Sequence, residues 1–269
     1  MRSYQIISRL LVVVLLAVGI TGCGSFTEKV GNSVIGEGSG TGELISLGKE
    51  SFKVEDFDKI HIKADAMAIF VIRSTTDNAE VELFVDNTIE SRFTLDASIQ
   101  TSKLNINVKE KEKRGSIINN SKGERKLNIS LPDKVFDQLV IDNNFGLVEV
   151  VDLNVESLDI SVDAGSIRLE NVIGEMNLTV EAGQIVVEEF SLENNLTAKT
   201  DAGAIRINLT ESPESAEINL VSEIGAVNSN IEGIDYSVNS SNKKVGTIGS
   251  DGYHIKASTS MGDIQVDSK

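Results

Sequence analysis

The sequence predicts an all-β protein whose second half is a parallel β-solenoid and whose first half is a more irregular set of β-strands. Two observations carry this prediction. Apolar and polar residues alternate along most of the chain after residue 50, as in strands with one buried face, and no stretch there has the period of an amphipathic helix. A glycine motif also recurs in the second half at a nearly constant spacing, which is typical of repeat proteins whose coils stack on one another.

The first 22 residues have the layout of an export signal. Arg2 and Arg9 supply positive charge, residues 10–20 form an apolar run, and the small residues Thr21 and Gly22 follow. The apolar run is shorter than the roughly 20 residues of a membrane-spanning helix, which disfavours the alternative of a retained anchor. We therefore expect residues 1–22 to be a signal peptide.

The end of this segment, Ile20, Thr21, Gly22 and Cys23, resembles the bacterial lipobox, in which a cysteine receives a diacylglycerol before cleavage. Ile20 stands where the motif prefers leucine. Cys23 is the single cysteine in the sequence, so no disulfide can form within the chain. The resemblance implies a lipoprotein that is lipidated at Cys23. The alternative is an ordinary signal peptide that ends near a cysteine.

Residues 23–50 are rich in glycine, serine and threonine and have no sustained periodicity, which predicts a lipidated, flexible tether. Short β-like stretches leave open a structured first strand within it. Residues 51–269 then form the predicted β-strand-repeat domain. Its first half has five alternating stretches, at residues 60–63, 68–73, 81–86, 93–99 and 104–109.

The charged and glycine-containing residues 109–126 predict a loop between two strands. Their lysines and arginines could instead form a polyanion-binding patch. The interleaved glutamates disfavour that alternative because they cancel most of the positive field.

The second half repeats one unit, which consists of an alternating strand, a glycine corner, a second strand and a loop. Successive corner glycines are 19, 18, 20 and 22 residues apart, and the last follows after 37 residues, close to two periods. Glycine is expected there because the corner needs a positive φ or a close approach that a Cβ would block. The predicted corner glycines are Gly146, Gly165, Gly183, Gly203, Gly225 and Gly262.

Stacked coils of about 19 residues bury their apolar edges only against one another. The alternation therefore predicts three successive layers of inward-facing side chains. The first contains Leu158, Ile160, Val162, Ile167 and Leu169, the second Met176, Leu178, Val180, Ile185 and Val187, and the third Leu196, Ala198, Ile205, Ile207 and Leu209.

Three features together resemble a bacterial putative-adhesin domain of unknown function that is related to the head GIN domain. They are FDKIHI at 57–62, KLNISLP at 126–132 and the iterated strand and glycine units, so the resemblance covers about residues 52–269. It implies a single-stranded, right-handed β-solenoid on the cell surface or membrane, and it implies no catalytic residues. The family usually has serine before the repeat glycine, where this chain has Ala164, Ala182 and Ala202.

Composition narrows the set of partners. The net charge of −16 predicts repulsion from nucleic acid and from anionic lipid headgroups, so any membrane attachment would come from the lipid. The chain has two histidines, His61 and His254, in separate strands, and no second histidine or cysteine near either to complete a zinc site. We expect surface positions for both and no enzyme activity. An enzyme that degrades polysaccharides with two carboxylates remains the alternative.

Four acids stand two residues before successive corner glycines: Asp163, Glu181, Asp201 and Glu223. If the coils stack in register, these acids form a ladder with about 4.8 Å between rungs. Like charges at this distance are unfavourable unless water or a cation compensates them, and oxygen ligands suit calcium. The ladder is thus a candidate Ca²⁺ site, and an acidic edge facing solvent is the alternative.

From these features we expect a lipid-anchored, non-catalytic binding or structural module with no cofactor, calcium at the acid ladder being the one candidate. It would lie outside the cytoplasm on the outer face of the cell membrane, or on the outer membrane of a host with two membranes. Its partner would be a cell-envelope polysaccharide or a membrane protein. The alternative is an accessory protein of an envelope-stress response that contacts a membrane protein.

Overall fold

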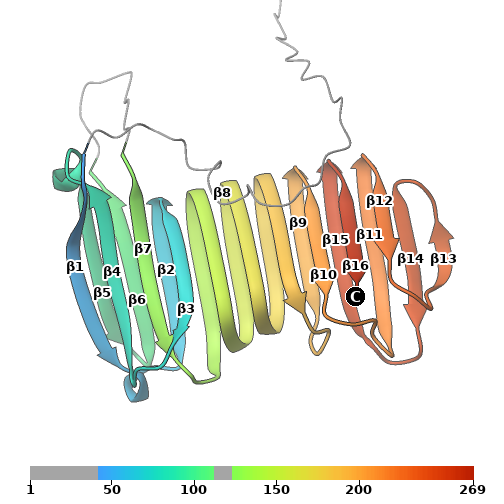
Figure 1. Cartoon of the computed structure of the whole chain (residues 1–269), viewed down its shortest axis with the longest axis horizontal. Coiled ribbons are helices and arrows are strands. Elements are labelled where there is room, and N and C mark those ends of the chain that lie inside the picture. Colours follow the sequence, from blue (N-terminus) through green and yellow to red (C-terminus); the bar gives the residue numbers. More distant parts are fainter. Residues whose placement is uncertain (1–41, 112–122) are drawn as a thin grey trace, which may run out of the picture. The chain divides into compact units, whose positions relative to one another are not determined.

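The strands of residues 42–111 and 123–269, which the computed structural model describes, pair into one 16-stranded sheet that folds into two layers (Figure 1). All of these residues fall in the compact unit Asn32–Lys269. The elements are β1 (Leu44–Lys53), η1 (Val54–Asp56), β2 (Lys59–Ala66), β3 (Ala68–Ser74), β4 (Asn78–Asp86), η2 (Glu90–Arg92), β5 (Phe93–Gln100), β6 (Lys103–Glu110), β7 (Arg125–Pro132), β8 (Phe136–Phe190), β9 (Leu196–Ala202), β10 (Ile205–Leu209), β11 (Ala216–Ile224), β12 (Val227–Asn230), β13 (Asp235–Asn239), β14 (Lys243–Ile248), β15 (Tyr253–Met261) and β16 (Ile264–Ser268).

The two layers meet in β8, which is 55 residues long and passes through both of them as it winds. The first layer includes the strands that lead into the corners, and its strand order is β5, β6, β2, β8, β9, β15, β11, β14 and β13. The second includes the strands that leave the corners, and its strand order is β1, β4, β7, β3, β8, β10, β16 and β12. The predicted all-β solenoid is therefore confirmed.

The core lies between the two layers, and the predicted inward-facing residues form its middle. Each of the residues predicted for the three layers is at most 2% exposed. Met176 pairs with Leu196 in one layer of the sheet, and Ile185 pairs with Ile205 in the other. The predicted stacking of the second and third layers is confirmed because the strand register brings these residues together.

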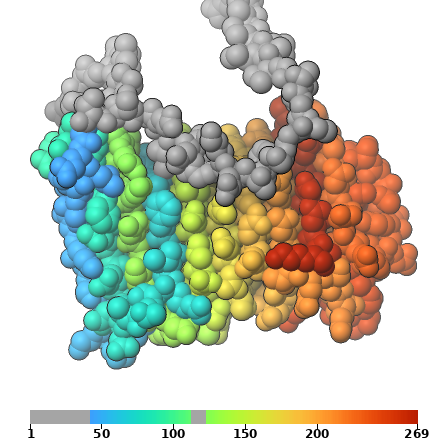
Figure 2. Space-filling view, viewed as in Figure 1, coloured from blue at the N-terminus to red at the C-terminus, as the bar shows by residue number. Residues whose placement is uncertain are grey.

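The order of the coils differs from the order of the sequence at the C-terminal end. β15 pairs with β9 on one side and β11 on the other, both parallel, and β16 likewise lies between β10 and β12. In Figures 1 and 2 the red C-terminal segment accordingly lies between orange segments that precede it in sequence. The Gly262 unit is therefore not the last coil of the solenoid, although its glycine is the last of the six in sequence. Along the sequence, the Gly225 coil and the β13–β14 hairpin come first, and the following strand β15 then pairs with β9.

The N-terminal half is more irregular, as predicted. β2 and β3 form a coil like the later ones, with parallel pairing to β8 in each layer, and β6 and β7 extend the two layers with further parallel pairs. β1, β4 and β5 close this end with antiparallel pairs. The alternating stretches predicted in this half correspond to β2 through β6.

One predicted boundary is wrong. β1 begins at Leu44 and pairs with β4 along its whole length, so residues 44–50 belong to the sheet rather than to a tether. Apolar side chains of this strand, including Leu47 and Phe52, pack against the core, which explains why a glycine-containing sequence is ordered there. The rest of the predicted tether, residues 23–41, and most of the predicted loop, residues 112–122, lie outside the described residues.

Candidate functional site

Six glycines and Met67 stack along one edge of the solenoid, which we call the corner edge. Each corner glycine has φ between +119° and +151°. A Cβ built on any of them would lie 1.5 to 2.4 Å from the carbonyl oxygen of the corner residue in the adjacent coil. No side chain can occupy such a position without moving backbone, so the corners require glycine for both conformation and space. The stacking order is Met67, Gly146, Gly165, Gly183, Gly203, Gly262 and Gly225.

Buried polar side chains help to hold this edge from inside. The amide of Asn143 donates to the Met67 carbonyl at 2.9 Å, the hydroxyl of Thr259 donates to Gly203 at 3.1 Å, and that of Ser222 donates to Gly262 at 2.8 Å. Each donor stands three residues before the glycine of its own coil. These bonds satisfy the second lone pair of corner carbonyls that are buried beneath the next coil.

The acids of the predicted ladder all lie exposed beside the corner edge, but they do not form four consecutive rungs. Pairing of Val180 with Thr200 and of Ala182 with Ala202 brings Glu181 next to Asp201. The inserted β15 then contributes Ser260, which separates Asp201 from Glu223. An uninterrupted ladder of Asp163, Glu181, Asp201 and Glu223 is therefore wrong. In residues 42–111 and 123–269, no group of three or more His, Cys, Asp or Glu side chains is placed to hold a metal ion.

Continued toward the N-terminal end, the same column includes Asn144 and Asp65, because Ala64 pairs with Asn143 and Ala66 pairs with Phe145. We call it the acidic column. Across the described chain it contains Asp65, Asn144, Asp163, Glu181, Asp201, Ser260 and Glu223, and its one ion pair there is Lys199 to Asp201 at 3.7 Å. The column thus concentrates negative charge along one side of the corner edge.

A second column runs parallel to the acids and is apolar throughout. It contains the residue before each corner, and the strand pairing aligns Ala66 with Phe145 at one end and Ala202 with Met261 and Ile224 at the other. We call it the corner ridge: Ala66, Phe145, Ala164, Ala182, Ala202, Met261 and Ile224. Phe145, Met261 and Ile224 are 56%, 59% and 65% exposed. Large apolar side chains so exposed on one line are the features that sequence reasoning missed.

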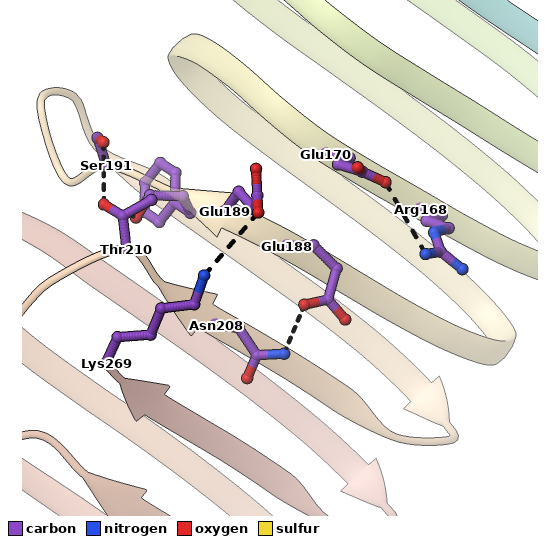
Figure 3. Close-up of polar contacts among 9 residues, drawn as sticks. Arg168, Glu170, Glu188, Glu189, Ser191, Asn208, Thr210 and Lys269 are labelled. Atoms are coloured by element: carbon purple, nitrogen blue, oxygen red, sulfur yellow. Dashed lines mark hydrogen bonds and ion pairs between the residues drawn. The ribbon is translucent and has the colours of Figure 1, made fainter. Parts of the chain in front are cut away.

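The opposite edge of the second layer is polar and cross-linked, as Figure 3 shows. Asn208 donates to Glu188 of the neighbouring coil at 2.7 Å, and the Ser191 and Thr210 hydroxyls lie 3.1 Å apart. Lys269 lies 3.9 Å from Glu189. The two long edges of the solenoid therefore differ, because one has its polar groups paired between coils and the other exposes apolar and acidic side chains.

The two histidines lie on the outer side of the first layer, in different strands. His61 lies 2.9 Å from the Asp142 carboxylate, and both side chains are partly exposed. Burial in its strand lowers the pKa of His254 and the nearby Lys256 lowers it further, while Glu217 and Glu175 act in the opposite direction. Neither histidine contacts a serine, threonine or cysteine side chain in these interactions.

The predicted lipidation residue Cys23 and the lipobox residues Ile20, Thr21 and Gly22 lie outside the described residues. Within residues 42–111 and 123–269, no helix is long and apolar enough to cross a membrane.

Residues 137–267 match the family model described as Toastrack DUF4097. The chain is similar in structure to a putative cell adhesion protein from Clostridium sporogenes ATCC 15579, with 13% sequence identity and a TM-score of 0.52 over 84% of this chain and 100% of that chain. It is also similar to a putative adhesin from Bacteroides fragilis NCTC 9343, with 16% identity and a TM-score of 0.42 over 84% of this chain and 97% of that chain. No curated protein matches the sequence. At this level of identity the similarity to the Clostridium protein supports the fold.

Proposed function

We propose, from the premise that residues 137–267 form a Toastrack DUF4097 domain, that this protein is a non-catalytic, adhesin-like binding module held on the outer face of the cell membrane. The observation that carries the proposal is the exposure of Phe145, Met261 and Ile224 in one line along the solenoid. Met261 and Ile224 are paired in adjacent strands, and Phe145 lies further along the same column, beyond Ala164, Ala182 and Ala202. Exposed apolar side chains that line up on one surface are typical of interaction sites.

The name of the structurally similar Clostridium protein, a putative cell adhesion protein, supports adhesion as the kind of binding. The acidic sequence supports a partner that is neither nucleic acid nor anionic lipid, because the net charge of −16 repels both. A cell-envelope polysaccharide or another membrane protein is consistent with this charge.

Anchoring through Cys23 forms the second part of the proposal. Its support is the lipobox-like sequence from Ile20 to Cys23 and the absence of any other cysteine from the chain. Cells that express the full chain would be labelled with a radioactive fatty acid and fractionated. We expect the label in the wild-type protein and its loss in Cys23→Ser, with the variant either released from membranes or left unprocessed. A label that persists in Cys23→Ser would overturn lipidation at this residue.

Binding would be tested with cells that display the full chain, compared with cells that carry Cys23→Ser. We expect displaying cells to adhere better to immobilised cell-envelope polysaccharide or to cells that present the partner. Chemical cross-linking on the same cells distinguishes a polysaccharide partner from a membrane-protein partner. A cross-linked membrane protein would favour the alternative of an accessory protein of an envelope-stress response. Release of reducing ends from the polysaccharide by the full chain would contradict a non-catalytic module.

A further inference from the structure

The corner edge combines three properties. Of the seven large apolar side chains exposed in residues 42–111 and 123–269, three lie in the corner ridge: Phe145, Met261 and Ile224. The acidic column runs beside them along the same coils. Small side chains, Ala164, Ala182 and Ala202, separate the large ones in the middle of the ridge. The edge is thus raised at Phe145 and at Met261 and Ile224, low at the alanines between them, and negative along one side.

The backbone of this edge offers no free strand to a partner. The amide of Met67 donates to Phe145 at 2.9 Å, that of Gly203 to Met261 at 2.8 Å, and that of Gly262 to Ile224 at 2.9 Å. These three corners thereby bond to the adjacent coil. A partner must consequently recognise the edge through side chains, by apolar contact with the ridge and by charge, rather than by adding a strand to a sheet.

From these observations we propose that the corner ridge and the acidic column together form the docking surface for an extended, cationic segment of a partner protein whose apolar side chains alternate with lysine or arginine. The proposal rests on the binding function proposed above and names the surface and the partner. Charge complementarity selects the cationic residues, because the acids Asp65, Asp163, Glu181 and Glu223 have no ion pair within the described chain.

The dimensions of the ridge select an extended segment. Seven residues at about 4.8 Å per strand give a ridge about 29 Å long, which an extended chain of about nine residues covers at about 3.3 Å per residue. A second copy of this chain fits poorly. A ridge roughly 10 Å wide would bury about 300 Å² on each copy, against about 800 Å² in a stable interface, and it would bring two acidic columns near each other.

The proposal is tested with the full chain in detergent and a fluorescent nine-residue peptide of alternating lysine and valine. Its dissociation constant would be measured by anisotropy at two salt concentrations. Two further peptides, one with glutamate in place of lysine and one with serine in place of valine, test the charge and the apolar component separately. We expect both to bind at least tenfold more weakly than the lysine and valine peptide.

The variants are paired with matched controls elsewhere on the surface. The double variant Phe145→Ser with Met261→Ser removes two large apolar side chains of the corner ridge. The control, Ile72→Ser with Val135→Ser, removes two similarly exposed apolar side chains that lie outside the ridge. We expect the first pair to weaken binding about tenfold or more and the second by less than twofold. Equal weakening by both pairs would overturn the ridge as the docking surface.

Charge is tested in the same way. Asp163→Asn with Asp201→Asn removes two acids of the column, and Asp137→Asn with Asp235→Asn removes two exposed acids that lie elsewhere, with the same change in net charge. We expect the column pair alone to weaken binding and to reduce its dependence on salt. Equal effects would mean that the peptide responds only to the overall negative charge and would overturn the proposal.

Adherence of cells that display the ridge variants separates this proposal from the function on which it rests. Wild-type cells that adhere no better than Cys23→Ser cells would contradict the binding function itself. Wild-type adherence that survives Phe145→Ser with Met261→Ser would leave the binding function standing and overturn the docking surface alone.

Discussion

Gly262, seven residues from the end of the chain, stacks directly on Gly203, whose carbonyl oxygen lies 1.9 Å from the position that a Cβ on Gly262 would occupy. Gly225 stacks in turn on Gly262, and a Cβ on Gly225 would lie 1.9 Å from the Gly262 oxygen. The last coil of the sequence is therefore an interior coil of the solenoid. Strand β15 of this coil is hydrogen-bonded to β9 and to β11, which both precede it in the sequence.

This interior position predicts that substitution of Gly262 lowers the free energy of unfolding as much as substitution of a corner glycine in the middle of the sequence. Gly262→Ala should lower the free energy of unfolding by about 2 to 4 kcal/mol, because the new Cβ meets backbone and the residue must keep a positive φ. Gly183→Ala, whose Cβ would lie 1.8 Å from the Gly165 oxygen, should cost a similar amount. Urea unfolding of the full chain measures both.

Gly48→Ala provides the control, because a Cβ at Gly48 meets no atom within 4 Å and the residue lies in a β-strand. We expect a change of less than about 0.5 kcal/mol there. A Gly262→Ala protein with the stability of the Gly48→Ala protein would contradict the interior position of the last coil.

A second prediction concerns two buried threonines that face each other in adjacent strands. Thr259 donates to the Gly203 carbonyl at 3.1 Å, whereas the hydroxyl of its pairing partner Thr200 has no hydrogen-bond partner within the described residues. Thr259→Val should destabilise the protein by about 1 kcal/mol, because it removes a buried hydrogen bond. Thr200→Val should stabilise it by about 1 kcal/mol, because it removes a hydroxyl that was buried without compensation.

The two substitutions have the same chemistry, so each serves as the control for the other in denaturant unfolding. In the preceding coils, valine occupies the position that corresponds to Thr200, as Val162 and Val180, and both valines are buried. The apolar side chain therefore fits at this position. Equal loss of stability in both variants would mean that the Thr200 hydroxyl is satisfied in solution.

Much of the fold follows from local patterns that the sequence displays. The alternation around Leu158, Met176 and Leu196 identifies the buried face, because the side-chain period of a strand is 2. In the structure these three side chains are at most 1% exposed. The corner glycines follow from spacing, because a Cβ has no room at any of them. These features depend on a residue and its near neighbours, which is the information that periodicity carries.

Features that depend on contacts between distant segments did not follow. Nothing local distinguishes an insertion of β15 between β9 and β11 from a simple continuation, since the repeat unit around Gly262 is the same in both cases. The corner ridge was missed for the same reason. Phe145, Met261 and Ile224 are scattered in sequence and align only once the coils are ordered. The interruption of the acid ladder by Ser260 is a further consequence of the insertion.

A third prediction concerns pH. Burial, and Lys256 in addition, lower the pKa of His254 below its ordinary value of 6.5, so the folded chain holds the neutral form more strongly than the unfolded chain does. The unfolded chain consequently binds more protons at low pH. This contribution to the free energy of unfolding is present above pH 6.5 and is lost as the pH falls below it.

His254→Gln should remove this dependence. We expect the difference in free energy of unfolding between wild type and variant to shift against the wild type from pH 7.5 to pH 5.5 in urea titrations. Carboxylates other than Glu217 and Glu175, which interact with His254, contribute equally to both proteins, so their titration cancels in the difference. A difference that stays constant across this range would contradict a lowered pKa at His254.

The last prediction concerns the acidic column and its response to ions. Asp163, Glu181 and Asp201 occupy successive rungs about 4.8 Å apart, and their mutual repulsion should weaken the folded state at low salt. Glu223 is separated from them by Ser260, and no group of acids in residues 42–111 and 123–269 is placed to hold a metal. Added sodium chloride should therefore raise the melting temperature by screening, and calcium at matched ionic strength should raise it by the same amount.

Replacing Ser260 by aspartate would join the two parts of the column, so Ser260→Asp should lower the melting temperature at low salt and increase its dependence on salt. Asp163→Asn with Asp201→Asn should reduce that dependence below the wild-type level. A rise in melting temperature that is specific to calcium and lost in Asp163→Asn with Asp201→Asn would show a cation site and contradict screening as the whole effect.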